Sequence, residues 1–263
     1  MPCNIMYMRY TEKEKNLIKK YYPLGGCKET IKYLNRSTDS VRHTAKKMGI
    51  KTICRQNLCD INDFKYISTE KMAYLLGFLW GDGHISYKPR YYFTTLSIKK
   101  EDGNNIKKIF DKRWKISHKK PQKKEWSPQI IFKLNHKELA TFLKDHDYTV
   151  KSLASPSKIL NKIHNKLKNH FFRGWFDADG HFSSSVTICG TYYQNWECLE
   201  KLSKKLKLKY KIYQWKSKNT KFSRFEITGK ESYSKFLSYI YKDANFKLDR
   251  KFLKYQKLIA KIG

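Results

Sequence analysis

Two segments of this chain repeat one pattern of residues, and that repeat constrains the fold more than any other feature. Residues 74–85 read YLLGFLWGDGHI and residues 171–182 read FFRGWFDADGHF, each with bulky residues around a glycine and then Asp-Gly-His. After each copy the hydrophobic pattern predicts two strands, a helix, two more strands and another helix. Such a duplication predicts two similar halves related by a pseudo-two-fold axis.

Small residues recur four positions apart inside each copy. They are Gly77 and Gly81 in the first copy, and Gly174 and Ala178 in the second. Residues four apart lie on one face of a helix, so two such helices can approach with little side-chain bulk between their backbones. We therefore expect the two halves to meet at these helices.

Each of these predicted helices ends in an acid. Gly83 and Gly180 suit a left-handed C-terminal cap, which places Asp82 and Asp179 at the helix ends. The carbonyl end of a helix is already partly negative, so two acidic ends side by side repel each other. A cation would remove this repulsion. We expect Mg²⁺, with Mn²⁺ as a substitute, because such hard cations bind carboxylate and carbonyl oxygens and bridge to phosphate.

The composition predicts a polyanionic partner. The 263 residues include 56 Lys and Arg against 23 Asp and Glu, a formal net charge of +33. A compact body with such an excess repels itself, and nucleic acid is the usual polyanion that neutralises it. With 15% aromatic and 40% hydrophobic residues the chain can still form a core.

Other classes of protein are disfavoured by the sequence. It contains no apolar run long enough for a membrane span, no apolar leader and no closely paired cysteines. We therefore expect no membrane partner, no zinc site and an intracellular, DNA-associated protein, in the cytoplasm of a prokaryote or phage-infected cell or in an organelle.

Residues 1–50 predict a small module of three helices before the repeat. Thr11 and Glu14 suit a capping box, the LGGC stretch at 24–27 breaks the first helix, and KETIKYLN and SVRHTAKKMGI form the other two. The segment resembles the helix-turn-helix modules of Myb and homeodomain-like proteins, in which the last helix would present Arg42, His43 and Lys46 to DNA. The alternative is a helical cap that only packs on the body. Residues 51–69 are predicted to be a linker.

The repeated residues resemble the signature of the LAGLIDADG family, as LLGFLWGDG at 75–83 and FRGWFDADG at 172–180. The resemblance implies an α+β fold with two pseudo-symmetric αββαββα halves, 70–152 and 153–263, which form a DNA-binding saddle of antiparallel strands. It also implies a monomeric homing endonuclease, of the kind associated with intron homing. Such an enzyme cuts both strands of a long asymmetric DNA target by metal-dependent hydrolysis and leaves short 3′ overhangs.

The same resemblance assigns site residues. Asp82 and Asp179 would bind metal, with help from the backbone carbonyls of Gly81 and Ala178. The family also places a lysine near the metals in each half, and the matching candidates are Lys151 in YTVKSLASP and Lys251 in KLDRKFLKY. Their positive charge would stabilise the phosphorane or orient the attacking water.

Three further residues of the repeat have other interpretations. Asp177 has no shared catalytic role in this reading, because Trp80 occupies its place in the first copy. His84 and His181 follow the two motifs at identical places, but hard Mg²⁺ prefers oxygen ligands. We interpret these histidines as a product of duplication or as phosphate contacts.

Side chains that alternate toward the groove along the strands are expected to read the DNA bases. The candidates are Ser86, Lys88, Arg90, Tyr92, Lys99 and Lys100 in the first half, and Ser183, Ser185, Thr187, Tyr213, Trp215, Lys216 and Arg224 in the second. Because the two halves differ at these positions, the target is predicted to be asymmetric.

Two other functions fit the same scaffold. An intron maturase would bind intron RNA and assist splicing, and a DNA-binding regulator would bind without cutting. Both acids are present, which favours a nuclease, although a maturase can retain them. The N-terminal module favours duplex DNA, because a recognition helix fits its major groove and cannot easily read that of A-form RNA.

Overall fold

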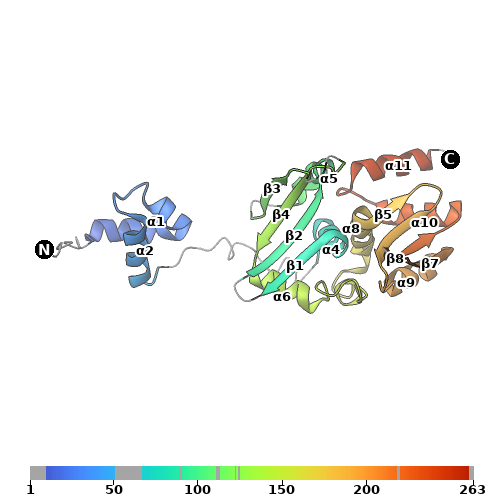
Figure 1. Cartoon of the computed structure of the whole chain (residues 1–263), viewed down its shortest axis with the longest axis horizontal. Coiled ribbons are helices and arrows are strands. Elements are labelled where there is room, and N and C mark those ends of the chain that lie inside the picture. Colours follow the sequence, from blue (N-terminus) through green and yellow to red (C-terminus); the bar gives the residue numbers. More distant parts are fainter. Residues whose placement is uncertain are drawn as a thin grey trace. The chain divides into compact units, whose positions relative to one another are not determined.

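The computed structural model describes residues 10–50, 67–88, 91–110, 113–121, 123, 125–217 and 220–260. The chain forms two compact units, Met1–Cys59 and Asp60–Gly263, both drawn in Figure 1. Most of the expected linker at 51–69 lies outside the described residues. Within the described part, no helix is long and apolar enough to cross a membrane.

The described part of the first unit contains two helices, α1 (Glu12–Thr30) and α2 (Thr38–Lys47), around a small core that includes Ile18 and Val41. Thr11 and Glu14 form the expected capping box. The prediction of three helices is wrong, because α1 continues through residues 24–27. Gly26 takes a φ of +66°, but Thr30 Oγ1 donates to its carbonyl at 2.9 Å, and Ile31 N donates to Cys27 O at 3.0 Å. Only residues 28–30 of the expected second helix are helical, and they belong to the last turn of α1.

The second unit contains two halves that each follow the predicted order αββαββα. The first half consists of α4 (Glu70–Asp82), β1 (Gly83–Lys88), β2 (Tyr91–Lys99), α5 (Lys100–Ile106), β3 (Lys115–Lys119), β4 (Gln129–Asn135) and α6 (Lys137–Asp145). The second half consists of α8 (Lys168–Asp179), β5 (Gly180–Phe182), β6 (Val186–Thr191), α9 (Glu197–Leu206), β7 (Tyr210–Lys216), β8 (Lys221–Ile227) and α10 (Lys230–Tyr241). Outside this order lie η2 (Lys107–Ile109), α7 (Ser157–Leu160), η3 (Asn165–Leu167) and α11 (Asp249–Ile259).

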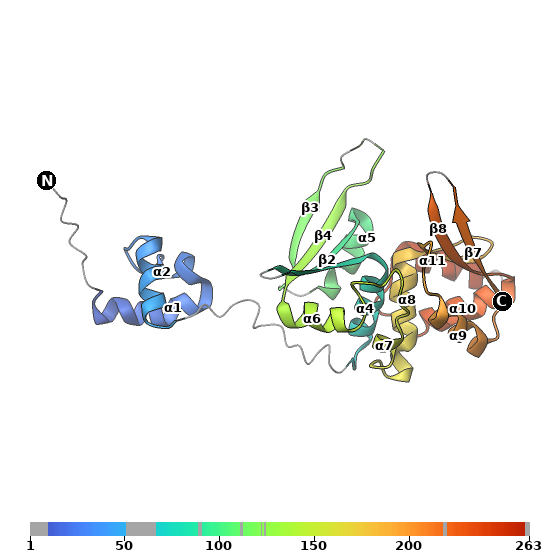
Figure 2. The ribbon, with the colours of Figure 1, turned by 60° about the horizontal axis from the view of Figure 1, so that its bottom comes forward.

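The two sheets have the same topology. Their strand orders are β1-β2-β4-β3 and β5-β6-β8-β7, and every pairing is antiparallel. Figure 2 shows the β3–β4 and β7–β8 hairpins extending in the same direction from the helical layer. This equivalence confirms the fold class predicted from the repeat.

Each sheet has one face packed on helices and one open face. Leu96 and Phe132 in the first sheet, and Ile188 and Phe225 in the second, are at most 1% exposed and lie on the packed faces. The neighbouring strand residues point the other way and are more exposed, as the alternation of side chains along a strand requires. The open faces are therefore available to a ligand.

Helices α4 and α8 touch backbone to backbone, as the small residues predicted. A Cβ atom on Gly77 would lie 1.9 Å from the Phe171 carbonyl oxygen, and one on Gly174 would lie 2.1 Å from that of Tyr74. The buried Arg173 adds polar contacts, donating to the carbonyls of Ile240 and Phe246 and pairing with Glu70 at the start of α4. The two halves are thus joined along these helices.

The predicted left-handed caps after the two helices are wrong. Gly83 has φ −71° and Gly180 has φ −86°, both with extended ψ, so each helix leads directly into a strand. Glycine is required there for space. A Cβ atom would lie 2.4 Å from the Leu79 carbonyl oxygen at Gly83 and 2.2 Å from the Phe176 ring at Gly180.

Candidate active site

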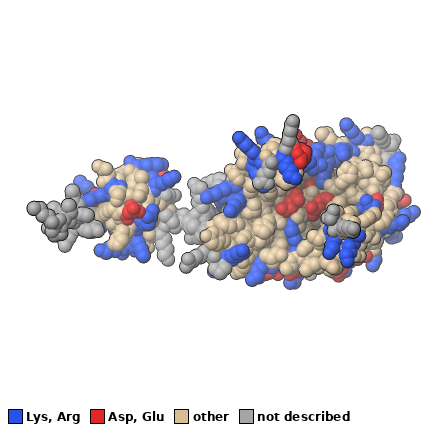
Figure 3. Space-filling view, in the orientation of Figure 1, with Lys and Arg blue, Asp and Glu red and all other residues tan. Residues whose placement is uncertain are grey.

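Asp82 and Asp179 are the last residues of α4 and α8, as predicted. A Cβ atom on Gly81 would lie 2.9 Å from Asp179 Oδ2 and 2.4 Å from the Ala178 side chain, so the Asp179 carboxylate rests against the last turn of α4. Figure 3 shows acidic atoms grouped in the middle of one face of the second unit, with lysines and arginines around them. The helix contact therefore brings the two acids together.

The surroundings of these carboxylates disfavour their charged forms. Desolvation by the surrounding protein raises the pKa of Asp82, although its side chain is open to solvent on one side. Desolvation and the neighbouring charge of Asp82 raise the pKa of Asp179 to about 6, against the opposing effects of Lys151 and Lys251. A cation bound between the carboxylates would relieve both penalties.

The two predicted lysines lie at the ends of the same helices. Lys151 Nζ donates to the carbonyl of Leu79 at 3.3 Å and to that of Gly81. Lys251 Nζ donates to the carbonyls of Phe176, Asp177 and Gly180 at 2.7, 2.9 and 2.5 Å. Each ammonium therefore adds a donor to carbonyl groups at a helix C-terminus, where the negative end of the helix dipole favours a cation.

Burial lowers the pKa of both lysines to about 8, while the nearby aspartates oppose the shift. Lys251 is the more enclosed, with 5% of its surface exposed. Near neutral pH both side chains remain mainly protonated, since their pKa values lie above 7. The protein thus places its own positive charges beside the acids.

The contacts of Lys151 involve the Gly81 carbonyl, which was predicted to be a metal ligand. Gly81 O was expected to assist a metal, and here it accepts a hydrogen bond from Lys151. None of the three carbonyls that Lys251 contacts belongs to Ala178, the corresponding residue in the second half. The two helix ends are therefore similar but not identical.

Asp177 is buried, and its carboxylate is bound by donors from the protein itself. Its side chain is 1% exposed and accepts hydrogen bonds from Tyr74 OH at 2.8 Å, Leu248 N at 2.9 Å and Tyr241 OH at 3.4 Å. Trp80, at the matching position of the first copy, is also buried and packs edge-on against Tyr148. The side chains at both positions therefore stabilise the packing of α4 and α8.

The donor set suits a hard divalent cation. Within the described ranges, no group of three or more His, Cys, Asp and Glu residues could hold a metal ion. Mg²⁺ typically uses only one or two protein carboxylates and takes its other ligands from water and phosphate. Asp82 and Asp179 meet that requirement. His84 and His181 directly follow the site on β1 and β5, on the open faces.

The predicted DNA-binding residues divide into groups. Those on the open faces are Ser86, Lys88 and Lys99 in the first sheet, and Thr187, Tyr213, Trp215 and Arg224 in the second. Ser183 and Ser185 lie in the β5–β6 turn, and Lys100 begins α5. Arg42, His43 and Lys46 are exposed on α2, whereas Arg90 lies outside the described residues.

Two candidates point away from the open faces. Tyr92 shares the packed face of β2 with Thr94 and Leu96, and it lies against Tyr87 with Lys137 Nζ 5.8 Å from its ring. Lys216 at the end of β7 lies on the packed side of its sheet by the same alternation. The register, which the sequence did not reveal, decides both positions.

Arg224 belongs to a cluster on the open face of the second sheet. Its guanidinium lies 4.7 Å from the Tyr213 ring centre and 5.5 Å from that of Trp215, and Nη2 is 3.2 Å from Glu226 Oε2. Arg224, Tyr213 and Trp215 were predicted from the sequence, but Glu226 was not. The signal was the period of two along β8, because Glu226 lies two residues after Arg224 and so shares its face.

Comparison with known proteins identifies one domain. Residues 166–241 match the model of the LAGLIDADG-like domain. The solved structure of the homing endonuclease I-WcaI bound to its DNA recognition sequence is similar at TM-score 0.48 and 19% identity, covering 74% of this chain and 98% of that one. Structures of I-DmoI in complex with DNA and Ca (TM-score 0.47, 17% identity, coverage 68% and 92%) and with DNA and Mn (0.46, 18%, 66% and 97%) are also similar. No curated protein matches the chain.

Proposed function

Since residues 166–241 are a LAGLIDADG-like domain and the first half repeats its topology, we propose that this chain is a site-specific double-stranded DNA endonuclease. It would hydrolyse both strands of a long, asymmetric target and leave short 3′ overhangs, acting as a DNA-associated monomer inside the cell. The pairing of Asp82 and Asp179 at the contact of α4 and α8 is the observation that carries this proposal.

A divalent cation, Mg²⁺ or in its place Mn²⁺, would be held by Asp82 and Asp179 and would supply Lewis-acid stabilisation of charge on the phosphate. The chain's own residues do the rest. Lys151 and Lys251 fix the helix ends through backbone carbonyls and place positive charge next to the reacting phosphate. The glycine contact between the helices holds these groups at one separation.

DNA binding would use the open faces of the two sheets. A net charge of +33 supplies the attraction to phosphates, and Lys88, Lys99 and Arg224 are basic side chains on these faces. Base reading requires side chains in the major groove, which admits two-stranded β ribbons. Because the two faces carry different residues, each half would read a different half-site.

The first unit supports an additional DNA contact. The exposed face of α2 carries Arg42, His43 and Lys46, while Val41 and Ala45 on the other face are buried. Arg42 forms an ion pair with the exposed Asp39 of its own helix at 2.6 Å, a contact that a phosphate can replace. Replacing Arg42 and Lys46 by Ala in the full chain should shorten the footprint on DNA. An unchanged footprint would leave this unit as a helical cap.

The endonuclease proposal is tested by sequencing the ends released from a large randomised duplex library, with Mg²⁺ and with chelator. The wild type should release discrete ends at one long motif only with Mg²⁺, and Asp82→Asn with Asp179→Asn should release none. Glu231→Gln, an exposed acid on α10, is the matched control and should cut normally. Absence of ends, despite salt-sensitive DNA binding, would favour the regulator. Stronger binding of an intron RNA would favour the maturase.

A further inference from the structure

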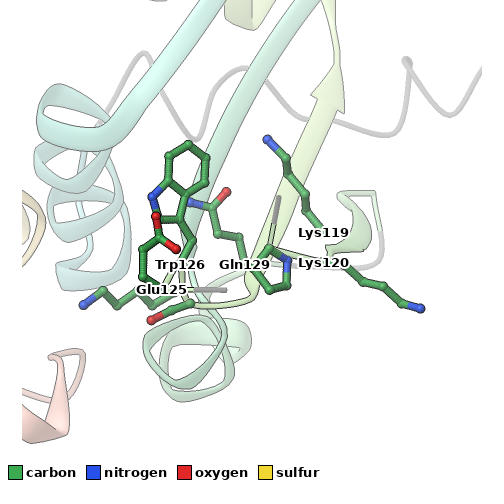
Figure 4. Close-up of a pocket in the computed structure, with 8 residues that line it drawn as sticks. Lys119, Lys120, Glu125, Trp126 and Gln129 are labelled. Carbon is green, nitrogen blue, oxygen red and sulfur yellow. The ribbon is translucent and has the colours of Figure 1, made fainter. Parts of the chain in front are cut away.

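A pocket of about 310 Å³ lies where the β3–β4 hairpin meets the end of β2. Its lining consists of Lys99, Lys119, Lys120, Pro121, Glu125, Trp126, Ser127 and Gln129. Figure 4 shows the Trp126 ring beside the Gln129 side chain, with Lys119 and Lys120 extending from the other side of the pocket. None of these residues contributes to the pair of acids described above.

The pocket depends on a hairpin connection that the second half does not share. In the first half, residues 120–128 join β3 to β4, whereas the shorter segment 217–220 joins β7 to β8. Five of the lining residues belong to the longer connection. The pocket is therefore specific to the first half, and the duplication does not account for it.

Trp126 has a large aromatic ring that is about half exposed. It is 51% exposed, and its described partner is the Lys123 ammonium, 5.5 Å from the ring centre. By contrast, the exposed Trp215 in the second sheet is already stacked on Phe222 at an interplanar angle of 6°. A large exposed aromatic ring costs free energy in water, and stacking with a nucleic-acid base removes that cost.

The polar groups around Trp126 match the other parts of a nucleotide. Lys99, Lys119 and Lys120 supply cations for a phosphate group. Ser97 donates to Gln129 Oε1 at 3.0 Å, which fixes the amide and leaves its NH₂ group to donate to a base edge. Glu125 is an acceptor suited to an exocyclic amino group.

We propose that this pocket binds a single nucleotide whose base has left the helical stack, with the base against Trp126 and its phosphate among the lysines. The volume lies at the lower end of the range for small-molecule pockets, which suits one nucleotide. A paired base within a duplex has both faces covered by its neighbours, so only an unstacked base can use the Trp126 ring. The proposal rests on the nucleic-acid binding proposed above but not on cleavage.

Photo-crosslinking tests the stacking directly in the full chain. The probe is a single-stranded octathymidylate in which one base is 5-iodouracil, which crosslinks to an aromatic ring stacked on it. Irradiation followed by mass spectrometry of the peptides should place the crosslink on Trp126. Crosslinking confined to Trp215 or to other aromatic residues, in a sample that binds the probe, would overturn the proposal.

Affinity measurements separate stacking from general charge attraction. By fluorescence anisotropy with the same octathymidylate carrying a dye, Trp126→Ala should bind about tenfold more weakly and Trp126→Phe nearly as well as wild type. Lys119→Ala with Lys120→Ala should reduce the salt dependence of binding by more than Lys204→Ala with Lys205→Ala, the charge-matched pair on α9.

A duplex of the same length completes the design. Its affinity should change less than that of the single strand when Trp126 is replaced. Equal losses for both would show that Trp126 contributes only to general DNA binding, and no loss for either would show that the pocket is unused. Neither result depends on Asp82 or Asp179, so failure here is distinct from failure of the endonuclease proposal.

Discussion

Arg250 in α11 holds both carboxylate oxygens of Asp102 in α5, with Nε–Oδ1 and Nη2–Oδ2 distances of 2.8 Å each. Next to it, Asp249 N donates to Asn105 Oδ1 at 2.7 Å. These contacts tie the last described helix of the second half to the first half. Lys251 follows Arg250 directly, so the same contacts set where its ammonium group meets the end of α8.

Loss of the Arg250–Asp102 pair should therefore impair one of the two strand cuts. With Asp102→Ala or Arg250→Gln, Lys251 is held less firmly, whereas Lys151 in the other half is untouched. We expect nicked circles to accumulate when a supercoiled plasmid carrying the target is digested, where the wild type gives linear DNA. Lys257→Gln, an exposed change on the same helix, is the control. Linear product at the wild-type rate from the Asp102 variant would refute this role.

Replacing Asp177 should destabilise the fold. Asp177→Ala leaves the buried Tyr74 hydroxyl and the Leu248 amide without their acceptor. Each unsatisfied buried donor costs about 1–3 kcal/mol, so thermal unfolding should occur at a clearly lower temperature. A variant that unfolds at the wild-type temperature but cannot cut DNA would instead assign Asp177 to the chemistry.

Replacing Asp179, two residues further along, should have the opposite effect in the absence of divalent metal. Its pKa is raised to about 6, so the folded state binds this proton more tightly than the unfolded chain. The resulting stabilisation is complete below the ordinary aspartate pKa and is lost as the pH rises through about 6. At pH 7.5, Asp179→Asn should therefore melt at a higher temperature than the wild type.

Two further measurements check that explanation. At pH 5 most of Asp179 is already protonated in the folded wild type, so the difference in melting temperature should shrink. Adding Mg²⁺ or Mn²⁺ at pH 7.5 should raise the melting temperature of the wild type more than that of Asp179→Asn, because a ligand that binds only the folded state stabilises it. A difference independent of both pH and metal would contradict the electrostatic origin.

The helix contact predicts which glycines tolerate a methyl group. Gly77→Ala and Gly174→Ala place a Cβ atom within 2.1 Å of backbone oxygens, which cannot move without separating the helices. We expect losses of about 3 kcal/mol or more, seen as failure to fold or a much lower denaturation midpoint. Gly103→Ala in α5 is the matched control. The nearest atoms to its Cβ would belong to the Ile130 side chain, at 3.0 Å, and alanine favours the helix by about 1 kcal/mol.

Features of the fold that depend on local periodicity could be predicted from the sequence. The duplicated pattern predicted two equivalent halves, the four-residue spacing of Gly77 and Gly81 predicted the helix contact, and the motif ends predicted the positions of Asp82 and Asp179. The left-handed caps failed because glycine at 83 and 180 is required by close packing, not by a positive φ.

Features that depend on long-range pairing could not be derived in this way. Tyr92 was assigned to the wrong face because the run YYFTTLSIK has polar and apolar residues on both alternations, and only pairing with β1 and β4 fixes the register. The Asp102–Arg250 pair joins residues 148 positions apart. No local pattern marks either residue, since a salt bridge between distant segments leaves no periodicity.

The contact of α4 with α8 at Gly77 and Gly174 lies in the helical layer, apart from the side chains on the open faces of the sheets. Substitutions on those faces can therefore accumulate without altering the distance between Asp82 and Asp179. In the proposed enzyme, the target sequence and the offset between the two strand cuts are therefore set by different parts of the fold. A lineage, or an engineer, could then change the target freely while every descendant produced ends of the same length.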